Sequence, residues 1–363
     1  MIFVYILFLL YASVSLQYHV PVANQYGQNL LSARDNEQDS RPNRIAVLEE
    51  PTNDIHPDQH DGLRKARLGE RCGQGHKKCK AHLCCSPAGY CGMTAAHCKS
   101  PDCQIGWGTC DADKVPQGLP TKEIQRPQNG PVPYGEVIVT CKTSYTFAMT
   151  FDDGPNEFTR DLLDLLDKYK AKATFFVTGV NSGKGQIDDF SRPWGSLIQR
   201  MHYSGHQIAS HTWSHQDLTA VSREQRHQQI LKNEAALRNI LGGFPTYMRP
   251  PYSKCDHACL RDVEQLGYHV ISFNLDTADY LNDSPEKIQR SKDIVNKALS
   301  KPSPAGRPFL AIGHDIHAQT VYNLTEYILR RVNEAGYRAV TVGECLEDPR
   351  DNWYRWDYRK KSD

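Results

Sequence analysis

Short apolar runs alternate with segments of helical periodicity over the C-terminal two-thirds of the chain. The runs, which have the length and composition of buried strands, cover residues 145–151, 173–178, 207–210, 247–249, 269–275, 308–312 and 338–342. Segments with apolar residues at helical spacing lie between them, at 158–170, 224–241, 256–266, 285–299 and 321–335. About seven β/α repeats predict an α/β fold in which a parallel sheet closes into a distorted (β/α) barrel.

The rest of the chain lacks this alternation and divides by composition. Residues 16–68 are rich in Asn, Gln, Asp, Arg and Pro, which predicts a polar linker or disordered arm. Five prolines between residues 111 and 135 predict a second, stiffer linker. The expected organisation is therefore a signal peptide (1–15), the arm (16–68), a cysteine-rich module (69–111), the Pro-rich linker (112–139), the barrel domain (140–349) and a C-terminal tail (350–363).

The first residues have the pattern of a secretory leader. An apolar run at 2–10 is followed by small residues at 12–15, and it is much shorter than the roughly 20 residues that a membrane span needs. An N-terminal anchor is the less favoured alternative. Two sequons, at Asn282 and Asn323, agree with export, although each can arise by chance. We expect a secreted glycoprotein, extracellular or associated with a cell wall.

The charge balance gives no indication of a strongly charged partner. Lys and Arg number 43 against 42 Asp and Glu, a formal net charge of +1. Binding to nucleic acid or to an anionic membrane surface usually needs a basic excess, so we expect neither. An uncharged partner and a monomeric protein are the expectation.

Twelve cysteines behind a leader predict disulfides rather than zinc knuckles or redox centres. Eight fall between residues 72 and 110, in a module too small to fold without bridges. The other four allow three pairings. Cys255 and Cys259 are close enough for a local loop, which leaves Cys141 to pair with Cys345 and tie the ends of one domain of about two hundred residues.

Polar and ionisable residues collect where the predicted strands end. In a β/α barrel these ends open on one face, so residues spread along the chain converge there. The candidates are Asp152, Asp153, His211, Arg249, Asp276, Asp279 and His314.

Asp153, His211 and His215 form a candidate metal site. A catalytic zinc takes three protein ligands and keeps a fourth position for water, and the spacing of the two histidines suits one helical turn. Two histidines at this spacing are weak evidence of a metal site by themselves. The case is stronger because Asp153 comes from the end of a different predicted strand. Asp152 and Asp153 are adjacent, so they can simply be one buried and one exposed residue of a strand. If both reach the mouth of the barrel, one ligand and one general base is the better division.

Five motifs in order resemble the polysaccharide deacetylases of carbohydrate esterase family four, most closely the secreted fungal chitin deacetylases. They are TFDDGP (150–155), HTWSH (211–215), RPPY (249–252), DTADY (276–280) and IGH (312–314). The resemblance implies a divalent metal, usually zinc and alternatively cobalt, bound by Asp153, His211 and His215. It further implies Asp152 as general base, oriented by Arg249, and His314 as general acid, oriented by Asp279. The backbone N–H of Tyr252 would hold the oxyanion.

Two positions depart from the family pattern. Tyr280 stands where Trp is usual, and Gly313 stands where a larger apolar residue is common. Both belong to walls rather than to the reacting set, so they put the pocket shape and the acyl preference in question. Asp276 remains open between a structural cap and a member of the site.

The cysteine-rich module is similar to hevein-type chitin-binding domains. The resemblance implies four disulfides: Cys72–Cys85, Cys79–Cys91, Cys84–Cys98 and Cys103–Cys110. Ser86 and Tyr90 match the serine and one aromatic of a sugar-binding face, where pyranose rings stack on flat side chains. Ala88 and His97 fall where further aromatics are expected. Weak chitin binding and a purely spacing role both stay open.

The two resemblances together imply a secreted, metal-dependent hydrolase that removes N-acetyl groups from chitin or chitin oligosaccharides and leaves chitosan and acetate. A deacetylase of the same family acting on acetylated xylan or peptidoglycan is one alternative. A non-catalytic chitin-binding wall protein is another.

Overall fold

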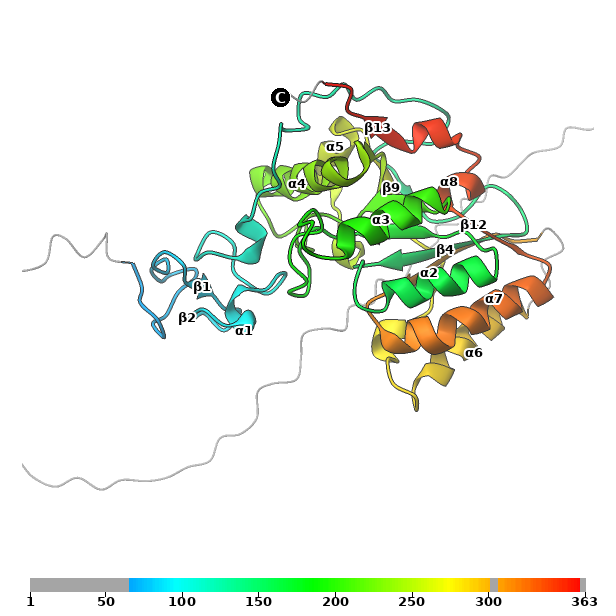
Figure 1. The fold of residues 1–363 in the computed structure, drawn as a ribbon, viewed down its shortest axis with the longest axis horizontal. Helices are drawn as coiled ribbons and strands as arrows, with labels where there is room; N and C mark the ends of the chain where they lie inside the picture. Colours follow the sequence, from blue (N-terminus) through cyan, green and yellow to red (C-terminus); the bar gives the residue numbers. More distant parts are fainter. Residues whose placement is uncertain (1–64, 301–305, 360–363) are drawn as a thin grey trace, which may run out of the picture. The chain divides into compact units, whose positions relative to one another are not determined.

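The computed structural model describes residues 65–300 and 306–359 (Figure 1). The predicted signal peptide and the polar arm up to residue 64 lie outside the described residues. The first described part is the cysteine-rich module, with two short antiparallel strands, β1 (Cys84–Cys85) and β2 (Cys91–Gly92), the helix α1 (Ala95–Cys98) and the 3-10 turn η2 (Asp111–Asp113). So little regular structure leaves the fold of the module to its disulfides.

A curled, largely parallel sheet organises the rest, as expected for the predicted α/β class. Its strands lie in the order β10-β11-β4-β5-β6-β8-β9-β3, and β12 pairs with the first half of β4. Their bounds are β3 (Val137–Ile138), β4 (Thr146–Asp152), β5 (Thr174–Val177), β6 (Gln207–Ser210), β8 (Tyr247–Met248), β9 (His269–Ile271), β10 (Leu275–Asp276), β11 (Phe309–His314) and β12 (Arg338–Val340).

Helices cover the outside of this sheet. The longer ones are α2 (Thr159–Lys168), α3 (Trp194–Tyr203), α4 (Arg223–Leu241), α5 (His257–Gln265), α6 (Ile288–Leu299) and α7 (Thr325–Glu334), the last continuing the turn η5 (Thr320–Leu324). Contacts run from α5 to α4, α3 and α2, then through η5 to α7 and α6 (Figure 1). None of the helices in the described ranges is long and apolar enough to cross a membrane.

Sequence patterns at the helix ends explain where the elements stop. Ser222 caps α4 by accepting a hydrogen bond from the Gln225 amide, and Gly242 ends that helix with φ 82°, a conformation that glycine adopts without steric cost. The helix α3 was not predicted. It follows Pro193 and buries Leu197, Ile198 and Met201, but its short apolar stripe follows a long irregular loop.

The apolar run predicted as one strand at 269–275 forms two. Residues 269–271 pair with β8 as β9, whereas 275–276 pair with β11 as β10, near the other edge of the sheet. The bend between them is held by Asn274, whose amide donates to the Leu310 carbonyl. The bend carries the chain from one side of the sheet to the other, which periodicity could not reveal.

The Pro-rich segment, predicted to be a stiff linker, packs against the domain. Arg126 forms a buried ion pair with Glu234 of α4 at 2.8 Å, and the Thr121 hydroxyl donates to the same carboxylate. Val132 is buried in the core, and β3 pairs with β9. Its side chains contact α4, which lies more than a hundred residues later in the sequence. The segment is therefore part of the domain surface.

The predicted C-terminal tail also packs on the domain. The strand β13 (Tyr354–Trp356) pairs antiparallel with β7 (Gly243–Pro245), and Trp353 is buried in the core. The shorter helix α8 (Val342–Cys345) and the turn η6 (Arg350–Asn352) precede it. Folded structure therefore continues past residue 349.

Removing the disulfide Cys141–Cys345 should destabilise the domain strongly. It closes a loop with a sequence separation of 204, whereas Cys255–Cys259 closes one of 4. Chain-entropy arguments give about 5 kcal/mol for the long loop and about 2 kcal/mol for the short one. Denaturant unfolding of the paired Ser variants measures both, and equal losses would contradict this assignment.

Candidate active site

The site residues stand at the carboxyl ends of neighbouring parallel strands. Asp152 is the last residue of β4, His314 is the last of β11, and the two are register partners. His211 directly follows β6, and Arg249 directly follows β8. The convergence that the sequence predicts is therefore present.

Asp152 and Asp153 both face this site because the backbone turns between them. Asp153 has φ 76°, in the left-handed region, so its side chain does not point to the opposite face as it would in a regular strand. Both residues are buried. The alternative of one buried and one exposed aspartate is thus excluded.

Asp153, His211 and His215 lie close enough to hold one metal ion. One potential ligand atom from each lies within 4.8 Å of the others. The Nε2 atoms of His215 and His211 lie 3.3 and 3.9 Å from Asp153 Oδ1. One carboxylate and two imidazoles are a donor set suited to a divalent cation such as zinc.

The surroundings of His211 prepare it to be a ligand. Its Nδ1 lies 2.7 Å from the Arg249 carbonyl oxygen, which can only accept, so Nδ1 carries the hydrogen and Nε2 presents its lone pair. Burial, aided by His215, lowers the pKa of His211 to about 3, which keeps the ring neutral. Burial alone would raise the pKa of Asp153, but His215 and His211 outweigh it and lower that pKa, so the carboxylate is ionised.

Asp152 is tied to Arg249 rather than to the ligand set. Arg249 Nη1 donates to Asp152 Oδ1 at 2.7 Å, and the guanidinium also donates to the carbonyls of Ile271 and Ser272. The other oxygen, Oδ2, lies 3.7 Å from His211 Nε2. Burial raises the pKa of Asp152 against the opposing effect of Arg249. One oxygen is fixed and the other faces the reacting space, as a general base requires.

His314 and Asp279 form the second charged pair. His314 Nδ1 lies 2.8 Å from Asp279 Oδ1, and its backbone amide donates to Oδ2 at 2.6 Å. Burial would lower the pKa of His314, but Asp279 raises it to about 10. The imidazole is therefore protonated at neutral pH, as a general acid requires.

Two exposed tyrosines flank the histidines. The Tyr252 ring lies 4.6 Å from the His215 ring, and the Tyr280 ring lies 5.6 Å from the His314 ring. Tyr252 has φ 58°, so the chain turns sharply there, and the oxyanion role of its amide stays a prediction. The role of Tyr280 as a wall of the pocket also stays a prediction. Asp276 accepts hydrogen bonds from the Ala278 amide and the Tyr280 hydroxyl, which makes it a cap for the turn that carries Asp279.

Three residues of the site were missed by the sequence reasoning. The buried Lys184 ammonium donates to the carbonyls of Asp153 and Gly154 at 2.8 and 2.9 Å. Asn181 donates to Asp153 Oδ1 at 3.0 Å. Asp315 is buried beside this group and accepts from the Thr159 hydroxyl. Asp315 follows the IGH motif directly and could have been found, whereas Lys184 and Asn181 lie in an irregular loop without any pattern.

Comparison with known proteins agrees with this geometry. Residues 140–271 match the polysaccharide deacetylase family, and residues 71–110 match the chitin recognition protein family. A chitin deacetylase of Colletotrichum lindemuthianum is 44% identical over 224 residues, which cover 62% of this chain and 88% of that protein. The chain belongs to the polysaccharide deacetylase family.

Further relatives define how far the likeness extends. The solved structure of the chitin deacetylase from the fungal pathogen Colletotrichum lindemuthianum matches with a TM-score of 0.59 and 41% identity, over 63% of this chain and 99% of that one. A probable peptidoglycan-N-acetylglucosamine deacetylase of Arthroderma benhamiae is 42% identical over 62% of this chain and 49% of that protein. The deacetylase domain alone therefore does not fix the substrate.

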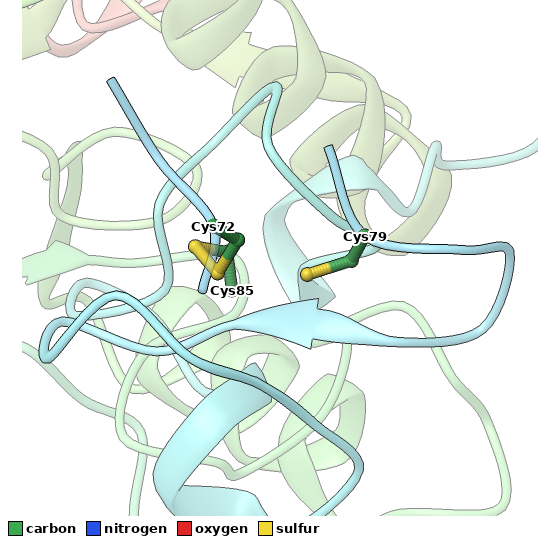
Figure 2. A group of neighbouring side chains, drawn as sticks. All are labelled: Cys72, Cys79 and Cys85. Atoms are coloured by element: carbon green, nitrogen blue, oxygen red, sulfur yellow. A yellow bond between two sulfur atoms is a disulfide. The ribbon is translucent and has the colours of Figure 1, made fainter. Parts of the chain in front are cut away.

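The chitin recognition module has the disulfide pairs that the resemblance implied. They are Cys72–Cys85, Cys79–Cys91, Cys84–Cys98 and Cys103–Cys110. Figure 2 shows the bond between Cys72 and Cys85 with Cys79 nearby. These three sulfurs lie as close as a metal site requires, but Cys79 is bonded to Cys91, so none of them is a thiolate ligand.

The predicted sugar-contacting residues of the module lie together. Tyr90 is 42% exposed, and its amide donates to the Ser86 hydroxyl at 3.2 Å. Arg71 donates to the Tyr90 hydroxyl, and its guanidinium lies 5.0 Å from the ring centroid. Ser86 is buried, and the His97 Nδ1 lies 2.8 Å from the Thr94 hydroxyl. Tyr90 is thus an exposed aromatic surface that a sugar ring can stack on.

Replacing Asp279 with Asn should move the basic limb of the pH–activity profile to lower pH. Asparagine cannot stabilise the imidazolium charge, so His314 loses its proton at lower pH and the acid form disappears earlier. Deacetylation rates measured from pH 6 to 10 test this. The matched control is Asp283→Asn, which breaks the exposed pair of Asp283 with His317 at 3.1 Å. An unshifted basic limb in Asp279→Asn would contradict the pairing.

Proposed function

We propose that this protein is a secreted, divalent-metal-dependent chitin deacetylase that hydrolyses the N-acetyl groups of N-acetylglucosamine polymers. The observation that supports it most is one charged arrangement. The Asp153, His211 and His215 donor set lies beside an arginine-paired Asp152, and a protonated His314 ends the neighbouring strand. The chitin recognition match at residues 71–110 favours chitin over acetylated xylan or peptidoglycan.

The reaction is the hydrolysis of an amide. A divalent ion held by Asp153, His211 and His215, with zinc the expected metal, would polarise the acetyl carbonyl and acidify the attacking water. Asp152 Oδ2 takes a proton from this water as the oxygen attacks the carbonyl carbon. The Tyr252 amide donates to the oxyanion.

Collapse of the tetrahedral intermediate breaks the C–N bond. His314 donates its proton from Nε2 to the departing nitrogen, because Nδ1 is held by Asp279. The products are acetate and a glucosamine unit with a free amine. Arg249 keeps Asp152 oriented, and Asp279 keeps His314 charged, so each reacting group has a fixed partner.

Export of the protein is supported by its covalent structure. Six disulfides involve all twelve cysteines, a usage typical of oxidising compartments. Of the two sequons, Asn282 is 5% exposed and its amide donates to the Ala278 carbonyl and the Ser291 hydroxyl, so it is a poor glycan acceptor. Asn323 is exposed and is the proposed site.

Acetate release from N-acetylglucosamine pentamer tests the function. The full-length protein should release acetate, a chelator should stop the release, and added zinc should restore it. Asp152→Asn should reduce kcat by about a hundredfold or more, because it removes the base and keeps the shape. Asp293→Asn, on the exposed face of α6, is the matched control.

Three outcomes would overturn the proposal. A wild-type protein that releases no acetate would support the non-catalytic wall protein. Acetate release only from acetylxylan or peptidoglycan would show that the protein is a deacetylase of the same family with a substrate other than chitin. Full activity of Asp152→Asn would refute the assignment of the base.

A further inference from the structure

The segment Ser100–Asp102 of the chitin recognition module lies beside the candidate active site. It is confined by Cys98 and Cys103, each disulfide-bonded to another cysteine of the module. Ser100 is buried, and its hydroxyl donates to the Asp111 carboxylate. These bonds give the segment a fixed shape, so groups on it can be held in a defined place.

Two backbone carbonyls of this segment accept hydrogen bonds from loops of the deacetylase domain. The Ser182 amide donates to the Ser100 carbonyl at 3.1 Å, and the Gln216 side chain donates to the Pro101 carbonyl at 2.9 Å. Gln216 directly follows the ligand residue His215. The segment thus touches a residue adjacent to the metal-ligand set.

The Ser182 contact leads to a second metal-ligand residue. Its neighbour Asn181 donates to Asp153 Oδ1 at 3.0 Å. The module is therefore hydrogen-bonded to the loop of Asn181 and Ser182, which supports Asp153. It is also hydrogen-bonded to Gln216, which follows His215.

The chain that leaves the module is fixed on the domain as well. The Ala112 carbonyl accepts from the indole of Trp213 at 3.0 Å and from the Lys232 ammonium at 2.8 Å. Trp213 is fully buried and lies within the HTWSH motif, between the two histidine ligands. The attachment at Ala112 and the contacts of Ser100 and Pro101 together form one continuous junction.

Asp102 presents its charge at this junction. It is exposed, and it directly follows Pro101, whose carbonyl accepts the hydrogen bond from Gln216. The Tyr252 ring lies against His215 and is 51% exposed. Because Gln216 directly follows His215, the exposed Asp102 lies next to the edge of the metal-ligand set.

We propose that the Ser100–Asp102 segment belongs to the substrate-binding site, with Asp102 accepting hydrogen bonds from hydroxyl groups of a sugar unit next to the unit being deacetylated. This inference rests on the proposed deacetylase function. A carboxylate accepts only, and pyranose hydroxyls supply donors. The polymer extends beyond the reacting unit, so a longer oligomer reaches Asp102. The module thereby takes part in substrate selection in addition to any retention on insoluble chitin.

The test compares chain-length dependence in full-length proteins. Wild type, Asp102→Ala and the matched control Glu70→Ala are assayed for acetate release from N-acetylglucosamine dimer and pentamer. Glu70 is an exposed acid of the same module that accepts from the Arg67 amide. The ratio of kcat/KM on pentamer to that on dimer should fall about fivefold in Asp102→Ala, mainly through KM, and should stay at the wild-type value in Glu70→Ala.

The outcomes separate this inference from the proposed function. An unchanged ratio in Asp102→Ala, or an equal loss on both oligomers, would overturn the role of Asp102 while wild-type activity stands. An equal fall of the ratio in Glu70→Ala would show that the effect comes from the net charge of the module. That result would also overturn the role of Asp102. Inactivity of the wild-type protein on every oligomer would instead defeat the deacetylase function.

Discussion

The site depends on two adjacent carboxylates, Asp152 and Asp153, reaching the same space from the end of one strand. A regular strand would send them to opposite faces. The left-handed backbone of Asp153 removes this conflict at a cost of about 1–3 kcal/mol. Hydrogen bonds from Thr178 and Lys184 to the Asp153 carbonyl offset this cost. Without that turn, one of the two carboxylates would point away from the site, and the pair could not supply both a metal ligand and a general base.

The same crowding explains the charges around the pair. Two buried carboxylates are unfavourable unless each has a partner. Asp152 has Arg249, whose guanidinium is fully buried, and Asp153 faces His211 and His215. Each partner also orients its acid, so the arrangement that makes the buried charges tolerable is the arrangement that separates base from ligand. The motifs of the polysaccharide deacetylase family, to which the chain belongs, had led us to expect Asp152 as the base and Asp153 as the ligand.

Local patterns in the sequence were sufficient for the parts of the site that lie on strands. Asp152, His211, Arg249 and His314 follow apolar runs, and their convergence follows from parallel topology. Contacts between distant residues left no such pattern. Residues 112–139 were predicted to be a linker because the Arg126–Glu234 pair spans more than a hundred positions. β9 and β10 were predicted to be one strand because the bend at residues 272–274 leaves no mark in the apolar pattern. Lys184 was missed for the same reason.

The central claim is that Asp153, His211 and His215 bind one catalytic divalent ion. Metal content of the purified full-length protein, measured by elemental analysis after dialysis against buffered zinc, tests it most directly. The account predicts one ion per chain in the wild type and in His257→Ala, an exposed histidine of α5, and none retained in His211→Ala. Equal metal content in His211→Ala and wild type would contradict it.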